Sequence, residues 1–198
     1  NAEAKAIATE IADSDQARIS VLRQLGYEPE AEPFMMFTTR SLEVPIPESV
    51  LPEGFSIRPA AGENEVVLLS DVHNGAFNGK WQPEEYLKVM RSPAYDIERE
   101  LVVVAPDGRF AAFTVIWFDA ISQSALFEPV GCHPDFQRKG LTRALMYEGM
   151  RRMVAQGMKT AVVAHLTDNP ASSGLYASLG FTPKRVITSY TKTTQASL

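Results

Sequence analysis

The sequence has few of the features that mark secreted, disulfide-bonded or membrane proteins. Its single cysteine, Cys132, cannot form a disulfide within the chain, which favours a reducing compartment, so we expect a cytoplasmic protein. The longest apolar stretch, residues 110–118, is interrupted by Thr114 and is far shorter than the roughly 18 residues that span a bilayer. The first residues show no basic region followed by an apolar run, so we expect no secretory leader.

The chain also lacks an excess of positive charge. Its 19 Lys and Arg residues against 24 Asp and Glu residues give a net charge of −5, which argues against general binding of nucleic acid or anionic membranes. A local basic patch can still bind an anionic ligand. The histidines His73, His133 and His165 are scattered without ligand-like spacing, so we expect no metal site. With 198 residues, 45% of them hydrophobic, the sequence is that of a globular domain with a further segment.

The clearest break in the chain is the proline-rich segment 44–54, which we interpret as an extended linker. Before it, apolar residues at helical spacing predict a helix that ends at Gly26, and a strand follows. After it, helices and strands are mixed, and Pro106-Asp107-Gly108 predicts a hairpin turn. The expected helices after the linker are residues 63–77, 83–90, 141–156 and 170–179, and the expected strands of the chain are 34–39, 55–58, 101–105, 109–118, 124–132, 160–165 and 181–191.

An internal repeat relates the two ends of the sequence. Shifted by 154 positions, DSDQARISVLRQLGYEP aligns with TDNPASSGLYASLGFTP, so that Leu25-Gly26-Tyr27 coincides with Leu179-Gly180-Phe181. In both places a polar cap leads into a helix, then Leu-Gly-aromatic, then a strand. We interpret this as a duplication, in which residues 1–41 are the end of a preceding copy, although two helices ending in Leu-Gly can also resemble one another by chance.

The segment EPVGCHPDFQRKGLTRALMYEGM, residues 128–150, carries the pattern most closely tied to chemistry. A predicted strand runs into a turn, and a predicted helix begins after Gly140. The first N–H groups of a helix have no intrahelical partner, and glycine lets a ligand approach the backbone closely. With Arg138, Lys139 and Arg143 nearby, this is the layout of a pyrophosphate site, while an ordinary solvated basic turn remains the alternative.

These motifs resemble those of the GNAT (Gcn5-related N-acetyltransferase) family. QRKGLT is similar to the family's Arg/Gln-x-x-Gly-x-Gly/Ala signature, and DNPASSGLYASLGF resembles its N-x-x-A-x-x-L-Y-x-x-x-G-F. The resemblance covers residues 54–192 and implies an α/β GNAT fold, a mixed central sheet flanked by helices. It divides the chain into a helix-plus-strand remnant of a preceding GNAT-like domain (1–41), a linker (42–53), the GNAT domain (54–192) and a tail (193–198).

The resemblance also implies roles for individual residues around acetyl-CoA. The strand backbone at Val130, Gly131 and Cys132 would pair with the pantetheine arm and polarise the acetyl carbonyl. Asn169 matches an asparagine that meets the cofactor, and Tyr176 matches a tyrosine that protonates the departing thiolate in many relatives. The groups around the pyrophosphate would be Gln137, Arg138, Lys139, Gly140, Leu141, Thr142 and Arg143.

Amine acetylation also needs a base or a water path that keeps the attacking amine neutral. Glu128 lies two residues before Val130, so strand alternation predicts that the two side chains share a face. Glu128 is therefore our candidate base, or else a carboxylate that binds a cationic acceptor. Thr142 departs from the family pattern, where Gly or Ala is usual. Trp81 and Tyr86 are expected either to line an acceptor pocket or to pack in the core.

The expected function is therefore transfer of an acetyl group from acetyl-CoA to a small-molecule amine or a peptide, by direct attack in a ternary complex. The alternative is a domain that binds acyl-CoA without catalysis, as a sensor or scaffold. Because GNAT-like domains often pair, a homodimer is a further expectation. We expect no metal, no nucleic acid and no membrane among the partners.

Overall fold

The computed structural model describes residues 5–194, which belong to two compact units. One unit holds the residues up to Thr39 and those from Val163 onward, and the other holds Arg40–Val162. The chain passes from one unit to the other within two strands, β3 (Met35–Ser41) and β8 (Thr160–Leu166). This division differs from a simple cut at the proline-rich linker.

The unit of residues 40–162 contains an antiparallel meander with the strand order β7-β6-β5-β4, and β8 lies beside β7 in the sheet. Consecutive strands pair antiparallel from β4 to β7, and Gly108, at a φ of 84°, closes the predicted hairpin between β5 and β6. The strands are β4 (Ser56–Pro59), β5 (Glu100–Val104), β6 (Phe110–Asp119) and β7 (Ser124–Cys132).

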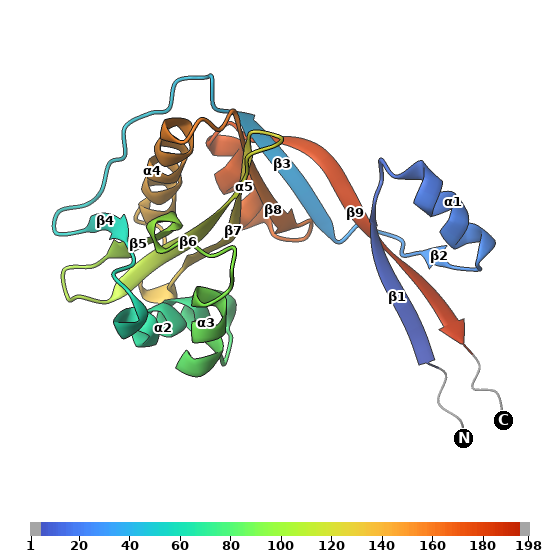
Figure 1. Cartoon of the computed structure of the whole chain (residues 1–198), viewed down its shortest axis with the longest axis horizontal. Helices are drawn as coiled ribbons and strands as arrows, with labels where there is room; N and C mark the ends of the chain where they lie inside the picture. The colour runs from blue at the N-terminus through green and yellow to red at the C-terminus, as the bar shows by residue number, and fades with distance from the viewer. Residues whose placement is uncertain (1–4, 195–198) are drawn as a thin grey trace. The chain divides into compact units, whose positions relative to one another are not determined.

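Helices cover both faces of this meander (Figure 1). On one face lie α2 (Val66–Phe77) and α3 (Pro83–Met90), and on the other lies α4 (Leu141–Ala155). Short 3-10 turns precede α2, β5 and α4: η1 (Glu63–Glu65), η2 (Ile97–Arg99) and η3 (Pro134–Phe136). Leu69 and Val72 of α2 pack with Phe113 of β6 in the core beneath the first pair of helices.

Two glycines set how closely the helices approach the β6–β7 pair. A methyl group on Gly131 of β7 would lie 2.8 Å from Cβ of Ala76 in α2 and 2.5 Å from Cε1 of Phe113. A methyl group on Gly149 of α4 would lie 2.5 Å from Cε1 of Phe127 on β7. Real Cβ atoms do not pack at such distances, so both contacts require glycine.

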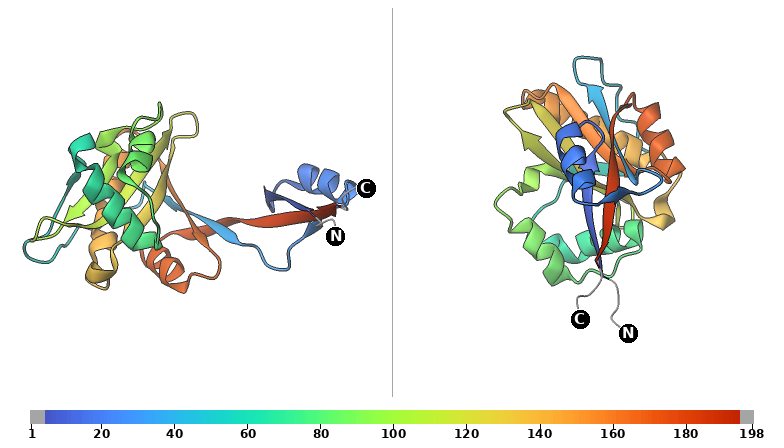
Figure 2. Two further views of the ribbon diagram at one scale, coloured as in Figure 1. Left: turned by 90° about the horizontal axis from the view of Figure 1, so that it is seen from below. Right: turned by 90° about the vertical axis from the view of Figure 1, so that its right-hand side faces the viewer.

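The other unit contains the strands β1 (Lys5–Ala12), β2 (Glu28–Pro29) and β9 (Thr182–Thr194), together with the helices α1 (Gln16–Gln24) and α5 (Pro170–Ser178). Its strand order is β1-β9-β3-β8, and β2 also pairs with β9. In the views of Figures 1 and 2, α1 lies beside the β1–β9 pair.

The predicted repeat recurs as structure within this unit. A shift of 154 residues carries α1 onto α5 and β1 onto the residues around β8. The first copy begins with β1 and ends with β3, and the second begins with β8 and ends with β9. The two copies exchange strands, because β1 pairs with β9 and β8 pairs with β3. Residues 35–41 are therefore an integral strand of the sheet.

Most expected elements after the linker are present, including β7 and α3 at their predicted bounds. The segment 44–54 has no helix or strand, but Ser49 Oγ donates to Ala144 O of α4 at 2.8 Å, so this segment is fastened to the helix. β1 was not predicted. β9 extends to Thr194, into the expected tail, and residues 195–198 lie outside the described range. No helix among residues 5–194 is long and apolar enough to cross a membrane.

Two helical glycines give a matched test of this packing. We expect Gly149→Ala to destabilise the protein by about 1–3 kcal/mol, because the added methyl group overpacks against Phe127. Gly174→Ala in α5 meets no atom within 4 Å and should instead stabilise by roughly 0.5–1 kcal/mol through helix propensity. Urea denaturation measures both changes. Equal effects at the two positions would contradict the close approach of α4.

Candidate active site

The turn between β7 and α4 leaves backbone N–H groups free at the start of a long helix. Arg138 and Gly140 both adopt left-handed conformations, with φ values of 65° and 76°. Gly140 is the N-cap of α4, and no side chain caps the helix there. Left-handed residues turn successive N–H groups toward one concave surface, which suits an anion. No heavy atom lies within 4 Å of the place where a Cβ of Gly140 would be, so a ligand has room to reach this backbone.

The basic residues of this turn carry charge that the protein does not neutralise. Arg138, Lys139 and Arg143 are exposed, and none of them forms an ion pair with another residue in the range 5–194. The ammonium of Lys139 lies 5.4 Å from the centroid of the Phe136 ring, which holds it beside the turn. Three unpaired cations and uncapped N–H groups favour a phosphate ligand.

Not every residue of the predicted pyrophosphate set can contribute a side chain. Gln137 is exposed, whereas Leu141 is only 1% exposed and belongs to the core, so only its backbone N–H is available. Thr142 is half-buried, and its side chain hydrogen-bonds Cys132. The hydroxyl of Thr142 is thus directed toward β7.

The environment of Cys132 keeps its sulfur protonated. Burial raises the pKa of this thiol above its ordinary value, and the Thr142 side chain and the charge of Lys139 oppose that shift only in part. His133 Nδ1 accepts a hydrogen bond from Asp135 N at 3.3 Å and thereby caps the turn η3. A Cys/His nucleophile pair is therefore not formed here.

The expectation that Glu128 and Val130 share a face is wrong, because β7 carries a bulge. Val130 pairs with Thr114 and Phe127 with Ile116, so two residues of β7, at positions 128 and 129, oppose the single residue Val115 of β6. Thr114 and Ile116 share one face by alternation, and that is the α4 face, where Phe127 and Ile116 meet Gly149. Val130 therefore lies on the α4 face. Glu128, next to Phe127, lies on the face covered by α2.

The Glu128 carboxyl is suited to hold a proton more tightly than an exposed carboxyl. Its side chain reaches water, but the surrounding protein removes part of its hydration, and this desolvation raises the pKa of Glu128 above its ordinary value. The backbone beneath it is held by a hydrogen bond, because Trp117 Nε1 donates to Glu128 O at 2.5 Å. A base with a raised pKa takes up a proton more readily near neutral pH.

An aromatic cluster lies on the same face of the meander as Glu128. The His73 ring centroid lies 4.5 Å from that of Trp81, 5.1 Å from that of Phe77 and 5.8 Å from that of Phe113, the residue opposite Gly131. Among the described side chains, His73 Nδ1 is the buried polar atom that has no hydrogen-bond partner. Sequence analysis missed His73, although its spacing to Phe77, one helical turn away, offered a signal.

Trp81 and Tyr86, for which the sequence left two roles open, differ in the structure. Trp81 is 39% exposed and can reach a ligand. Tyr86 is 2% exposed and donates to the buried carboxylate of Glu100, to which Tyr95 also donates. Burial raises the pKa of Glu100, and the hydrogen bonds from the two tyrosine hydroxyls oppose that shift. Because it is buried and bonded to this carboxyl group, Tyr86 is a core residue.

Asn169 and Tyr176 belong to the other compact unit, in and before α5. Asn169 is the N-cap of α5, and its Oδ1 accepts a hydrogen bond from Ser172 N at 3.1 Å. Tyr176 is 5% exposed, and its ring packs against His165 and Phe181 at centroid distances of 5.7 and 6.1 Å. In the first copy, position 22, which corresponds to Tyr176, is a leucine that packs against Ile11, Ile19 and Tyr190. No group of three or more His, Cys, Asp or Glu side chains within residues 5–194 is placed to hold a metal ion.

Comparison with known proteins agrees with the motifs. Relatives include mycothiol acetyltransferases of Nocardia farcinica, 30% identical with 86% of this chain and 59% of the relative covered, and of Pseudarthrobacter chlorophenolicus, 30% identical with 84% and 54% covered. The chain thus spans about half the length of the curated relatives it matches.

Similar solved structures include a GCN5-related N-acetyltransferase from Sphaerobacter thermophilus (TM-score 0.77, 19% identity, 98% of this chain and 62% of that chain covered). A tandem GNAT protein from the clavulanic acid biosynthesis pathway has a TM-score of 0.75 at 15% identity, and the match covers 98% of this chain and 65% of that protein's chain. At these identities the likeness establishes a shared fold. The model of the acetyltransferase (GNAT) family matches residues 67–181, more than half of the sequence, and the chain belongs to that family.

Proposed function

We propose that this chain transfers an acetyl group from acetyl-CoA to the primary amine of a small molecule, by direct attack in a ternary complex. The observation that carries the proposal is the turn at residues 138–140, where left-handed backbone, an uncapped helix and unpaired basic side chains favour a pyrophosphate. Acetyl-CoA supplies an acyl group already activated as a thioester. Membership of an acetyltransferase family supports the same reaction.

In this proposal the residues of the chain divide the work. The turn from Gln137 to Arg143 binds the pyrophosphate, with Leu141 contributing only its N–H. The backbone from Val130 to Cys132 orients the thioester and supplies an N–H donor to the carbonyl oxygen, where negative charge develops. Glu128 receives the proton of the attacking amine, directly or through water, and Tyr176 gives a proton to the departing sulfur. Asn169 contacts the cofactor beside α5.

We infer a small-molecule acceptor because several relatives are named mycothiol acetyltransferases. The aromatic cluster of His73, Phe77 and Trp81, on the face of the meander that carries Glu128, supports a pocket for the apolar part of such an amine. The first experiment measures free CoA thiol released from acetyl-CoA with mycothiol-related amines, other small amines and peptides. Release with a small amine supports the proposal, and tight binding of acetyl-CoA without release with any acceptor would favour a sensor or scaffold.

We further infer that residues 1–41 are the end of a preceding GNAT-like copy, with residues 42–53 as linker and 54–192 as the acetyltransferase domain. The offset of 154 residues between α1 and α5, and between β1 and the residues around β8, supports this division. A single cysteine, Cys132, present as a free half-buried thiol, supports a reducing, cytoplasmic setting.

Two glycines with the same backbone conformation allow a controlled test of the pyrophosphate site. Gly140→Leu and Gly157→Leu should each cost about 1–2 kcal/mol, because both positions have φ near 77° and both are open. Only Gly140→Leu should abolish acetyl-CoA binding, because its side chain occupies the place of a phosphate. Calorimetric titration compares the two variants, and intact binding in Gly140→Leu would move the pyrophosphate elsewhere.

Replacement of Tyr176 by phenylalanine tests the proposed acid. The ring is buried and keeps its packing in Tyr176→Phe, so the fold should be preserved. We expect kcat to fall by about 10²-fold or less, since water can replace the acid in part, while the affinity for acetyl-CoA stays nearly constant. Steady-state kinetics and calorimetry give both values. An unchanged kcat would remove Tyr176 from the mechanism.

Glu128→Gln separates the two roles that the sequence left open. If Glu128 is the base, kcat falls in the variant. In addition, kcat no longer rises with pH as it does in the wild type, where the rise follows ionisation of this carboxyl group. If Glu128 only binds a cationic acceptor, KM for that acceptor rises while kcat is retained.

Thermal unfolding of the same variant checks the pKa independently. A folded-state pKa above the unfolded value means that stability falls as the pH rises from the unfolded pKa through the folded pKa, because the folded protein then has to hold Glu128 in its ionised form. Glu128→Gln should therefore raise the Tm at pH 8 relative to wild type and leave it unchanged at pH 3, where the carboxyl is protonated in both states. An equal gain at both pH values would contradict the raised pKa.

A further inference from the structure

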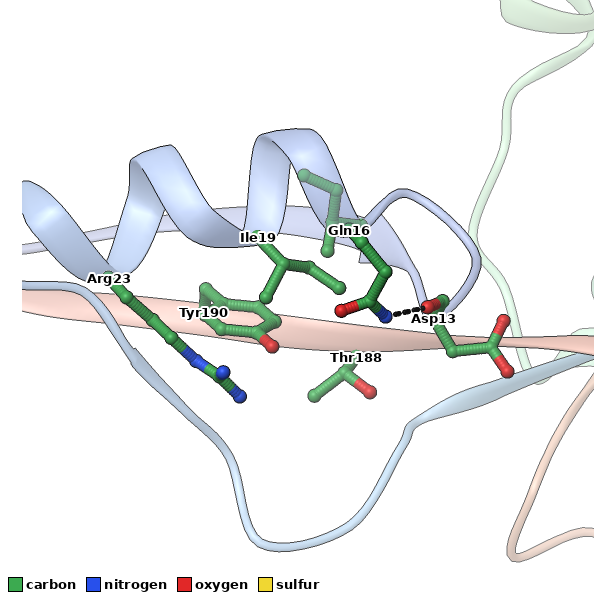
Figure 3. A pocket seen from close by; sticks show the side chains of 7 residues that line it. Asp13, Gln16, Ile19, Arg23, Thr188 and Tyr190 are labelled. Atoms are coloured by element: carbon green, nitrogen blue, oxygen red, sulfur yellow. Dashed lines mark hydrogen bonds between the residues drawn. The ribbon is translucent and has the colours of Figure 1, made fainter.

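A pocket of about 190 Å³ lies between α1 and the strands β1 and β9, within one compact unit (Figure 3). At roughly 30 Å³ per water molecule, it has room for a ligand the size of about six waters. Its floor is apolar, since Ile11 and Ile19 are 8% and 6% exposed. The lining residues are Ile11, Asp13, Gln16, Ile19, Arg23, Thr188 and Tyr190. None of them belongs to the proposed acetyl-transfer set.

Tyr190 places a hydroxyl group in the wall of this pocket. The residue is only 4% exposed, and its hydroxyl forms no hydrogen bond with another residue in the range 5–194, but the oxygen atom itself is not buried. Figure 3 shows the hydroxyl directed toward Thr188. A ligand oxygen or nitrogen in the pocket would replace water as the hydrogen-bond partner of this hydroxyl.

Opposite charges stand at the two ends of the pocket. Figure 3 shows the guanidinium of Arg23 on one side of Tyr190 and Thr188, and the carboxylate of Asp13 on the other. Neither charge forms an ion pair within the described part of the chain. The Asp13 end is fixed in place, because Asp13 N donates to Val186 O at 3.0 Å and Gln16 Nε2 donates to Asp13 O at 2.7 Å.

The repeat does not account for these polar groups. The positions 154 residues after Asp13, Gln16 and Arg23 are Thr167, Pro170 and Ala177, and those 154 residues before Thr188 and Tyr190 are Phe34 and Met36. Both charges and both hydroxyl groups of the pocket are thus particular to this end of the unit. The corresponding positions at the other end carry no charge and are mostly apolar.

We infer that this pocket binds a small extended zwitterion, with its carboxylate at Arg23 and its ammonium at Asp13. Asp13 precedes the first residue of α1, Gln16, and Arg23 lies in the last turn of this helix. Residues 16 and 23 are about 10 Å apart along the helix axis at 1.5 Å per residue, so the two charges of the ligand are separated by several bonds. An ω-amino carboxylate fits this spacing, and an α-amino acid is too short to reach both ends. The hydroxyls of Tyr190 and Thr188 contact the middle of the ligand or its carboxylate.

The test titrates the chain with 6-aminohexanoate and follows binding by calorimetry and amide chemical shifts. We expect saturable binding with shifts at α1 and β9, and weaker binding of glycine, hexanoate and hexylamine, each of which lacks the length or one charge. Arg23→Gln and Asp13→Asn should each weaken binding about tenfold or more, because each removes a charge-assisted hydrogen bond.

Arg18→Gln is the matched control, because Arg18 lies on the same helix, is exposed and pairs with Asp15 outside the pocket. It should leave binding unchanged, and all three variants should bind acetyl-CoA like wild type. No saturable binding of 6-aminohexanoate, or equal binding of hexanoate with no effect of Asp13→Asn, would overturn the proposal.

Discussion

The close approach of two helices to the β6–β7 pair is the constraint on which the rest of the structure depends. Gly131 admits α2 on one face and Gly149 admits α4 to the other, and neither contact has room for a methyl group. The second contact fixes the axis of α4, and with it the direction of the free N–H groups at residues 140–143. The proposed pyrophosphate site is thus set by packing at a glycine more than two helical turns away.

The bulge in β7 provides the second constraint. One extra residue between Phe127 and Val130 moves Glu128 to the face covered by α2, the face that also carries His73, Phe77 and Trp81. A regular strand would have put Glu128 on the side of α4, away from that cluster. The proposed base and the proposed acceptor pocket therefore depend on the same irregularity, which also fits the known concentration of bulges beside active sites.

Sequence reasoning succeeded where local signals decide the structure and failed where distant pairing does. The bounds of α3 follow from Pro83 and the acidic first turn, and the turn before α4 follows from Gly140. β1 was missed because its strand depends on pairing with β9 at the other end of the chain. The face of Glu128 was mispredicted because alternation carries no information about a bulge.

The proposed acetyl transfer depends most directly on binding of acetyl-CoA through the free N–H groups between residues 138 and 143. Hydrogen–deuterium exchange of the chain with and without acetyl-CoA measures those groups directly. We expect protection of the amides from Arg138 to Arg143 on binding, while the amides of the turn at residues 119–123 exchange as before. Binding without protection at the start of α4 would mean that the pyrophosphate binds elsewhere on the chain.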